Sequence, residues 1–285
     1  MLRSVGAPPT PAMASGLPQR VPAGPLVERR PGAVPSARRF PGAHRSSLGS
    51  RTQGGGNLLI ACWSVKGGSG TTVVATALAL LLARSTDSRV VLADLGGDVP
   101  AASGVPEPLG PGLVDFAGAG EDVPTDAFDR LETRVTPSLS LLHAGGHSAA
   151  GSPAESLRAL TSADGERVAL ALTQHYASSS VVVDCGPPGN ACGNAIAAAA
   201  GLSLLVMRPC YLALRRAAQS EMRPSGVVLI CEPGRSLGAS EVRDVLGVPV
   251  RAEVPYDPAV ARVVDAGLLS TRVPRCIERA LRVAA

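Results

Sequence analysis

The sequence predicts an α/β fold in which a mostly parallel β-sheet carries helices on both faces. Apolar segments of strand length alternate with apolar segments of helix length along most of the chain. The strand-like segments are continuous apolar runs, such as Val181-Val182-Val183, rather than alternating patterns. Strands that are buried on both faces have this composition, and they belong to parallel sheets covered by helices on each side.

The expected elements follow one another from residue 57 to near the end of the chain. In the first half, the apolar patterns predict strands at 57–63, 89–94 and 139–143, and a helix at 72–84. A Gly- and Pro-rich excursion ends near Leu113, and a helical pattern over 154–176 is interrupted near Asp164-Gly165. In the second half they predict strands at 180–184, 202–207, 226–231 and 248–254, and helices at 190–200, 211–222, 239–246, 258–266 and 274–283.

The first 56 residues differ in composition from the rest of the chain. They contain nine prolines, eight arginines and one acidic residue, Glu28, without a periodic apolar pattern. Such a segment buries too little apolar surface to offset its chain entropy, so we expect a disordered Pro/Gly/Arg-rich tail over 1–56 and a folded domain over 57–285. The domain holds 19 basic and 22 acidic residues, a charge of about −3. The basic tail could contact nonspecific DNA or an anionic membrane; the alternatives are a solvated linker or a misassigned start codon.

Composition also bears on the cellular location. The sequence shows neither an apolar run of about 18 residues, the length that spans a membrane, nor an apolar signal region after the first arginines. We therefore expect a cytoplasmic protein, free or peripheral to the membrane or nucleoid.

The six cysteines show no metal-ligand spacing. Buried thiols in a reducing cytosol explain them, and we expect no metal cluster.

A glycine-rich run carries the strongest functional signal. The chain has 26 arginines but a single lysine, Lys66, which opens the run Lys66-Gly67-Gly68-Ser69-Gly70-Thr71-Thr72 between a strand-like and a helix-like segment. Strand, glycine turn and helix form a phosphate-binding loop, whose backbone N–H groups and helix N-terminus point at an anion. The run therefore predicts nucleotide binding, with the hydroxyl of Thr72 as a direct Mg²⁺ ligand.

Acidic residues follow two further predicted strands. Asp94 and Asp98 come at and after the end of one strand, and Asp184 ends another. Because ligands bind beyond the carboxyl ends of the strands of an open parallel sheet, we expect these side chains to lie near the glycine loop. Asp184 would hold Mg²⁺ or one of its water ligands. The alternative for an aspartate that ends a strand is a turn or a helix cap.

These motifs resemble those of the ParA/MinD family of P-loop ATPases, and the resemblance covers essentially 57–285. The family's loop reads K-G-G-x-G-K-[ST]-[TS], which Lys66-Gly67-Gly68 and Gly70 match. The resemblance implies a P-loop NTPase fold of the SIMIBI type with ATP and Mg²⁺ as cofactors. It places Pro255 and Asp257, in a segment similar to a late family loop, near the base. Three further segments are similar to family motifs, namely Val90–Leu95, Leu141–Gly145 and the Walker B-like Val181–Pro188.

The resemblance also implies an assembly. In this family two ATP-bound protomers form a sandwich, and the signature lysine, here Lys66, reaches the partner's phosphates. We therefore expect an ATP-dependent homodimer, with Lys66, Asp94 and Asp98 as candidate catalytic residues. The last helix could anchor to a membrane, as in the MinD branch, or pack on the sheet; its few large apolar residues favour packing.

Two departures from the family pattern bear on catalysis. Thr71 occupies the position of the loop's own lysine, and Gly96 stands where a second aspartate positions the attacking water; Asp98 lies two residues late for that task. Phosphoryl transfer depends on positioning and electrostatic stabilisation, so both losses should slow ATP hydrolysis by several orders of magnitude. No asparagine follows the strand at 226–231, which leaves base selectivity open.

The expected function is accordingly an ATP-binding switch with weak or absent hydrolysis. It would act with a protein partner of unknown identity in chromosome partitioning, septum-site determination or pilus assembly, since atypical loops also occur in the septum-site-like and TadZ/CpaE-like branches. The alternatives are an active partitioning ATPase that binds nonspecific DNA, and a degenerate scaffold that binds no nucleotide.

Overall fold

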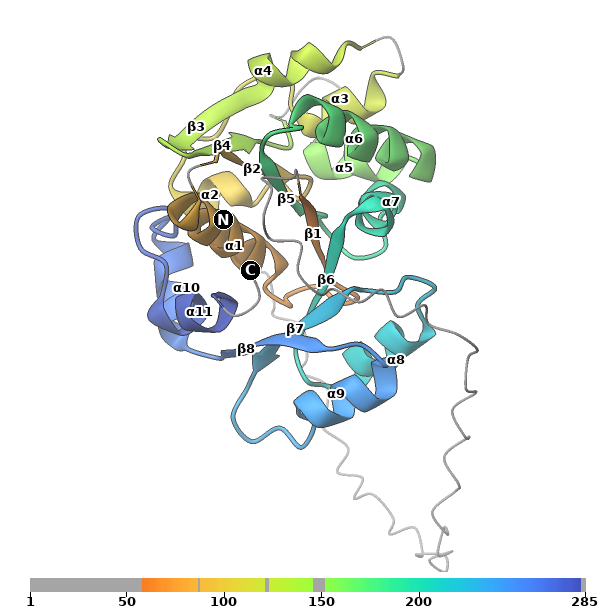
Figure 1. The fold of residues 1–285 in the computed structure, drawn as a ribbon, viewed down its shortest axis with the longest axis vertical. Helices are drawn as coiled ribbons and strands as arrows, with labels where there is room; N and C mark the ends of the chain where they lie inside the picture. Colours follow the sequence, from red (N-terminus) through yellow and green to blue (C-terminus); the bar gives the residue numbers. More distant parts are fainter. Residues whose placement is uncertain (1–57, 87, 121–122, 146–151, 283–285) are drawn as a thin grey trace, which may run out of the picture. The chain divides into compact units, whose positions relative to one another are not determined.

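A single mixed sheet organises the part of the chain that the structure describes. This computed structural model describes residues 58–282 except 87, 121–122 and 146–151, so the tail predicted at 1–56 lies outside the described residues. Within them, eight strands lie in the order β3-β4-β2-β5-β1-β6-β7-β8 (Figure 1). The strands are β1 (Leu59–Trp63), β2 (Val90–Asp94), β3 (Glu132–Thr136), β4 (Leu139–Leu142), β5 (Ser180–Asp184), β6 (Leu202–Met207), β7 (Gly226–Cys231) and β8 (Val250–Pro255).

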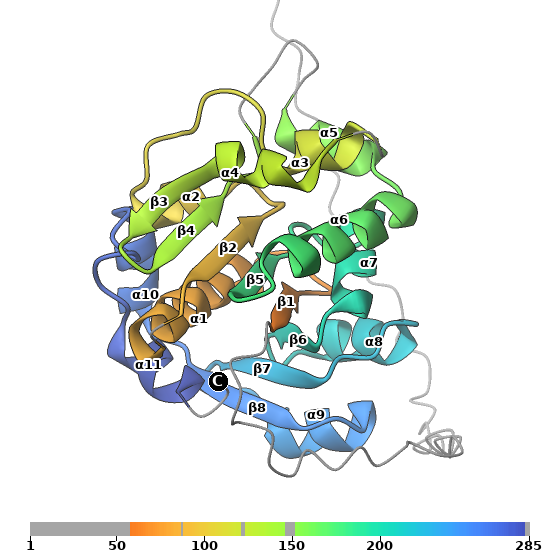
Figure 2. The same ribbon diagram turned by 45° about the horizontal axis from the view of Figure 1, so that its top comes forward.

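Helices cover both faces of this sheet, as the sequence predicts (Figures 1 and 2). One face packs against α1 (Thr71–Ser85), α2 (Val99–Ser103), α10 (Pro258–Asp265) and α11 (Arg275–Leu281). The other face packs against α3 (Leu113–Gly118), α5 (Pro153–Ala159), α6 (Ser162–His175), α7 (Ala191–Ala199), α8 (Tyr211–Gln219) and α9 (Ala239–Leu246). The short elements η1 (Thr125–Ala127) and α4 (Phe128–Leu131) precede β3.

The central strands contribute side chains to both cores. All five residues of β1 are buried, with Ile60 and Cys62 in one core and Ala61 and Trp63 in the other. Successive residues of a strand point to opposite faces, so a strand covered on both sides must be apolar throughout. This confirms the parallel, doubly covered sheet: all neighbouring strands run parallel except β3, which pairs antiparallel with β4.

The edge strand β3 was not predicted. Its sequence, Glu132-Thr133-Arg134-Val135-Thr136, is polar and its residues are half-buried or exposed. It pairs on one side only, so the apolar run that marks the inner strands is not required there. The Gly- and Pro-rich excursion likewise contains the short helix α2, which the sequence pattern did not indicate.

The predicted break in the helical region 154–176 is wrong in position. The interruption falls at Leu160-Thr161, where the Thr161 side chain accepts a hydrogen bond from the Asp164 backbone N–H, and Asp164 accepts one from the Thr161 N–H (2.9 Å). This reciprocal cap at Thr161 starts α6 at Ser162, two residues before Asp164. Gly165 is buried inside α6, and a Cβ added there would lie 2.3 Å from the Cys192 carbonyl oxygen of α7. The glycine therefore permits close helix packing and does not end a helix.

The last helix packs on the sheet. Ile277 and Leu281 of α11 are buried in the same core as α1 and β8, and Cys276 and Ala280 pack against that core. This agrees with the packed alternative; α11 ends at Leu281, and residue 283, the last of the predicted helix, lies outside the described part. None of the described helices has the length and apolarity needed to cross a membrane.

The cysteines are less uniformly buried than expected. Cys62, Cys185 and Cys192 are buried, but the other three are only partly covered because they lie at the ends or edges of elements: Cys210, Cys231 and Cys276.

Candidate nucleotide-binding site

The glycine-rich run forms a loop between β1 and α1. Gly68 and Gly70 have φ values of 72° and 89°, in the left-handed region that favours glycine. The Ser69 hydroxyl donates to the Lys66 carbonyl oxygen (2.6 Å), and the Val74 N–H donates to the Gly70 carbonyl oxygen (3.0 Å), which starts α1. A Cβ added at Gly67, Gly68 or Gly70 would meet no atom within 4 Å, so no other described residue packs closely against the loop at these positions, and all three glycines line an open cleft. Such a cradle fits a phosphate chain bound by backbone N–H groups.

The strand ends that carry the predicted acids lie beside this loop. β5 lies between β2 and β1, and Asp184 is in register with Asp94 on one side and with Cys62 on the other. All three strands run parallel, so their carboxyl ends face the same edge of the sheet. The structure therefore brings Asp94 and Asp184 together with the glycine loop, as expected from the sequence.

Asp94 is held by its own backbone neighbourhood. It is fully buried, and its carboxylate accepts hydrogen bonds from the N–H groups of Gly96 (2.8 Å), Gly97 (2.9 Å) and Val99 (3.0 Å). Burial, together with the charge of Asp184, raises the pKa of the Asp94 carboxyl to about 7, and the three N–H groups oppose this rise. Both carboxylate oxygens thus fix the turn that leads from β2 into α2.

Asp184 has a different environment. Its side chain is 1% exposed, and Oδ1 accepts a hydrogen bond from the Gly186 N–H (3.1 Å), whereas Oδ2 accepts none from the described residues. Burial raises the pKa of this carboxyl, and the nearby Thr72 hydroxyl and the Gly186 N–H partly oppose the rise. A buried carboxylate oxygen without a partner, beside a hydroxyl at the start of α1, fits a hydrated cation such as Mg²⁺.

A cleft of about 740 Å³ opens over the loop. Asp98, which is exposed at the start of α2, faces it together with Thr71, Thr72 and Gly96. Lys66 is exposed and is not among the described residues that line this cleft. The loop residues that line it are Gly67, Gly68, Ser69, Gly70, Thr71 and Thr72.

Two charged residues of the cleft were not identified from the sequence. Arg158 of α5 and Asp265 at the end of α10 both line it, and their helices pack on opposite faces of the sheet. Neither residue belongs to a motif, and each reaches the cleft only because its helix packs at the edge of the sheet where β1, β2 and β5 end. Spacing along the chain gives no signal for such residues.

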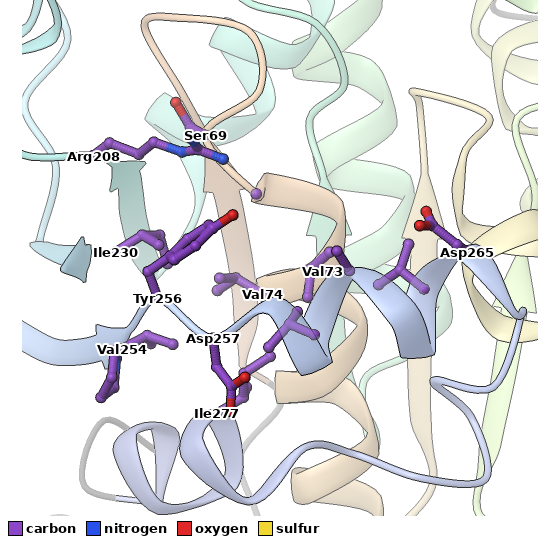
Figure 3. A pocket seen from close by; sticks show the side chains of 15 residues that line it. Ser69, Val73, Val74, Arg208, Ile230, Val254, Tyr256, Asp257, Asp265 and Ile277 are labelled. Carbon is purple, nitrogen blue, oxygen red and sulfur yellow. The ribbon is translucent and has the colours of Figure 1, made fainter. Parts of the chain in front are cut away.

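A second pocket, of about 240 Å³, adjoins the loop on the side of β8 (Figure 3). The segment after β8 supplies Pro255, Tyr256 and Asp257, and the loop supplies Ser69 and Gly70. Its other lining residues are mainly apolar side chains, such as those of Val74, Ile230, Val254 and Ile277. An apolar slot beside a phosphate cradle suits a planar base.

The polar groups at one end of this pocket are charged, and no asparagine follows β7. The guanidinium of Arg208 lies 5.9 Å from the centre of the Tyr256 ring (Figure 3). It also pairs with Glu232 (2.9 Å). Asp257 accepts a hydrogen bond from the Ala259 N–H (2.8 Å) and so caps α10. Glu232, which follows β7, is thus engaged in an ion pair rather than free to read a base.

Comparisons with known proteins fit this geometry. The CbiA family, described as the CobQ/CobB/MinD/ParA nucleotide binding domain, matches residues 60–270, most of the chain. The chain belongs to this family. No curated protein matches this ParA/MinD-type chain in sequence.

Solved structures of similar fold include two archaeal proteins. The cell division ATPase MinD of Pyrococcus furiosus is 20% identical, with a TM-score of 0.62, and the match covers 80% of this ParA/MinD-type chain and 97% of that one. The septum site-determining protein MinD of Pyrococcus horikoshii, complexed with Mg-ADP, is 19% identical (TM-score 0.61; 80% and 94% covered). A ParA family ATPase of Chlorobium tepidum is also 19% identical (TM-score 0.59; 80% and 97% covered). At these identities the likeness shows the fold.

No group of three or more His, Cys, Asp or Glu side chains within the described ranges is arranged to hold a metal ion.

Proposed function

We propose that the chain is an ATP-binding switch protein that dimerises with bound ATP and acts in positioning, partitioning or assembly. The observation that carries this proposal is the open glycine cradle at residues 67–70, set beside the Thr72 hydroxyl and the buried Oδ2 of Asp184, which accepts no hydrogen bond from the part of the chain that the structure describes. Membership of a nucleotide-binding family supports it. A similar fold, the Pyrococcus horikoshii MinD, was solved with Mg-ADP.

Each part of the site has a role in this proposal. The N–H groups of residues 67–72 would bind the phosphates, and Thr72 with Asp184 would hold Mg²⁺ directly and through water. Pro255 and Asp257 would flank the base in the adjoining pocket. Bound Mg²⁺ supplies charge neutralisation at the phosphates.

Hydrolysis should be weak. Thr71 brings no charge to the phosphates, and Gly96 offers no side chain to orient a water. Asp94 is fully buried, does not line the cleft, and its carboxylate already accepts hydrogen bonds from three backbone N–H groups, so it is not placed to take a proton from a water in the cleft. Asp98 faces the cleft and is exposed, which leaves it as the candidate for the catalytic task.

A role for Lys66 in a partner's site fits its position. Its side chain is exposed and does not line the cleft of its own protomer. In a two-fold assembly, a compact ammonium on a flexible stem would enter the cleft of the partner. ATP would then bridge two surfaces and favour the dimer by mass action.

Titration calorimetry of the full chain with Mg-ATP tests this proposal. We expect measurable heat, and an ATP-dependent rise in melting temperature that requires Mg²⁺. Thr72→Ala should weaken binding in the presence of Mg²⁺, whereas Thr173→Ala, on the outer part of α6, should not. Absence of heat together with an unchanged melting temperature would favour the scaffold without nucleotide.

A further inference from the structure

The cleft over the glycine loop is poor in positive charge. Among the described residues that line it, Arg158 is the only basic one, whereas Asp98 and Asp265 are acidic. Two more carboxyl groups, those of Asp94 and Asp184, are buried below the cleft. A triphosphate that enters here carries several negative charges, so one cationic side chain at the right place has a large effect.

The fold holds Arg158 at this place. Ala154 and Arg158 are four residues apart on α5, and both line the cleft, so one face of the helix is turned toward it. Leu157 is fully buried and packs on Gly186, where an added Cβ would lie 3.2 Å from the leucine Cδ2. This contact fixes α5 against the segment that follows Asp184.

The guanidinium of Arg158 is also free to bind a ligand. It is exposed and forms no hydrogen bond or ion pair with the described residues. Most other arginines near the site are engaged: Arg208 pairs with Glu232, and Arg216 donates to the Val65 carbonyl oxygen (3.4 Å).

The geometry points to Arg158 as the residue that binds the terminal phosphate of the nucleotide. From α5, Arg158 supplies the positive charge that a loop lysine at position 71 would bring and that Thr71 does not. This inference rests on the proposed function. The base pocket shares Ser69, Gly70 and Val73 with the cleft, and the cleft extends from there to Gly186, Pro187 and Arg158. The phosphate farthest from the base therefore comes nearest to Arg158. A planar guanidinium donates two parallel hydrogen bonds to a phosphate.

Calorimetry with the full chain tests this inference. Arg158→Gln should weaken Mg-ATP binding by roughly 10- to 100-fold, the range for a lost hydrogen bond to a charged group. Binding of Mg-ADP should change much less, because the terminal phosphate is absent. Arg243→Gln serves as the matched control and should bind both nucleotides like wild type, because Arg243 of α9 is exposed and its side chain pairs with none of the described residues.

A rescue experiment separates a direct role from a structural one. Thr71 lines the same cleft, so Thr71→Lys in the Arg158→Gln background should restore most of the lost ATP affinity. An equal loss for ATP and ADP, or a failure of Thr71→Lys to rescue while the melting temperature stays unchanged, would overturn the inference. If wild type binds nucleotide and Arg158→Gln binds it equally well, only this inference fails. If wild type binds no nucleotide, the proposed function fails with it.

Discussion

Gly96 faces Oδ2 of Asp184, the carboxylate oxygen that has no hydrogen-bond partner among the described residues. A Cβ built on Gly96 would lie 3.8 Å from Asp184 Oδ2 and 3.5 Å from Asp94 Oδ1, at the ends of two adjacent strands. Its nearest contact, with the Gly186 Cα at 3.4 Å, is an ordinary van der Waals distance, and its backbone is outside the left-handed region. A side chain at position 96 would therefore be tolerated by the backbone, and it would enter the cleft above both carboxyl groups.

Because position 96 can accept a side chain, a pair of substitutions should raise the rate of ATP hydrolysis. Gly96→Asp combined with Thr71→Lys should bring ATP hydrolysis close to ordinary family rates, whereas either change alone should not, because one supplies only the water-positioning group and the other only the charge. Thr71→Lys alone should tighten ATP binding. Phosphate release measured under saturating Mg-ATP checks this, with Gly96→Asn plus Thr71→Lys as the matched control. Wild-type turnover at family rates would contradict the roles given to both positions.

Lys66 should control assembly. Lys66→Ala and Lys66→Arg should both abolish an ATP-dependent dimer while leaving the monomer folded, because arginine's wide planar fork is a poor substitute for a compact ammonium in a glycine-walled cleft. Light scattering with and without a non-hydrolysable ATP analogue measures the mass, and circular dichroism controls for folding. If wild type stays monomeric with saturating nucleotide, the sandwich assembly is wrong.

Replacing two helical glycines by alanine should change the free energy of unfolding in opposite directions. Gly165→Ala should lower the free energy of unfolding by about 1–3 kcal/mol, since its Cβ would overlap the Cys192 carbonyl oxygen at 2.3 Å and push α6 from α7. Gly118→Ala, where the nearest atom is Leu160 Cδ2 at 3.7 Å, should raise it by about 0.4–1 kcal/mol. Urea unfolding of both variants provides the measurement. If Gly165→Ala leaves the free energy of unfolding unchanged, α6 and α7 can move apart without a loss of stability.

His143 should make the protein sensitive to acid. It is 5% exposed, Nδ1 has no partner among the described residues, and burial lowers its pKa although the charge of Asp115 opposes this. The unfolded chain then binds a proton at higher pH than the folded chain, so stability falls as pH drops below about 6.5. His143→Gln should lose less stability than wild type between pH 7 and pH 5.

Chemical denaturation of the two proteins at matched salt checks this. Comparing them is necessary because Asp94, whose pKa is raised, acts in the opposite sense: its contribution is present at low pH and is lost as pH rises toward about 7. Parallel pH profiles of wild type and His143→Gln would exclude a titrating role for His143.

The sequence predicts the inner strands and the glycine loop because both leave local signatures. A strand covered on both faces must be apolar, as in β1, and a left-handed turn favours glycine, as at Gly70. The edge strand β3 and the cleft residue Arg158 leave none, because β3 depends on pairing with β4 and Arg158 depends on the packing of α5. Gly165 leaves no local signal either, because the need for a glycine at this position comes from the close approach of the neighbouring helix α7.

The hydrogen bonds from Gly96, Gly97 and Val99 to Asp94 have a consequence for the history of this protein. Backbone N–H groups donate all three bonds, so they hold the turn after β2 whether or not position 96 carries a side chain. Folding of this turn therefore does not require a particular side chain at position 96. Two of the four glycine codons become aspartate codons by a single base change, so the turn can gain or lose this carboxyl group in one mutational step without being rebuilt. Because Gly96→Asp alone should not restore hydrolysis, a lineage would also need to regain the charge missing at Thr71 before the lifetime of the ATP-bound state changed.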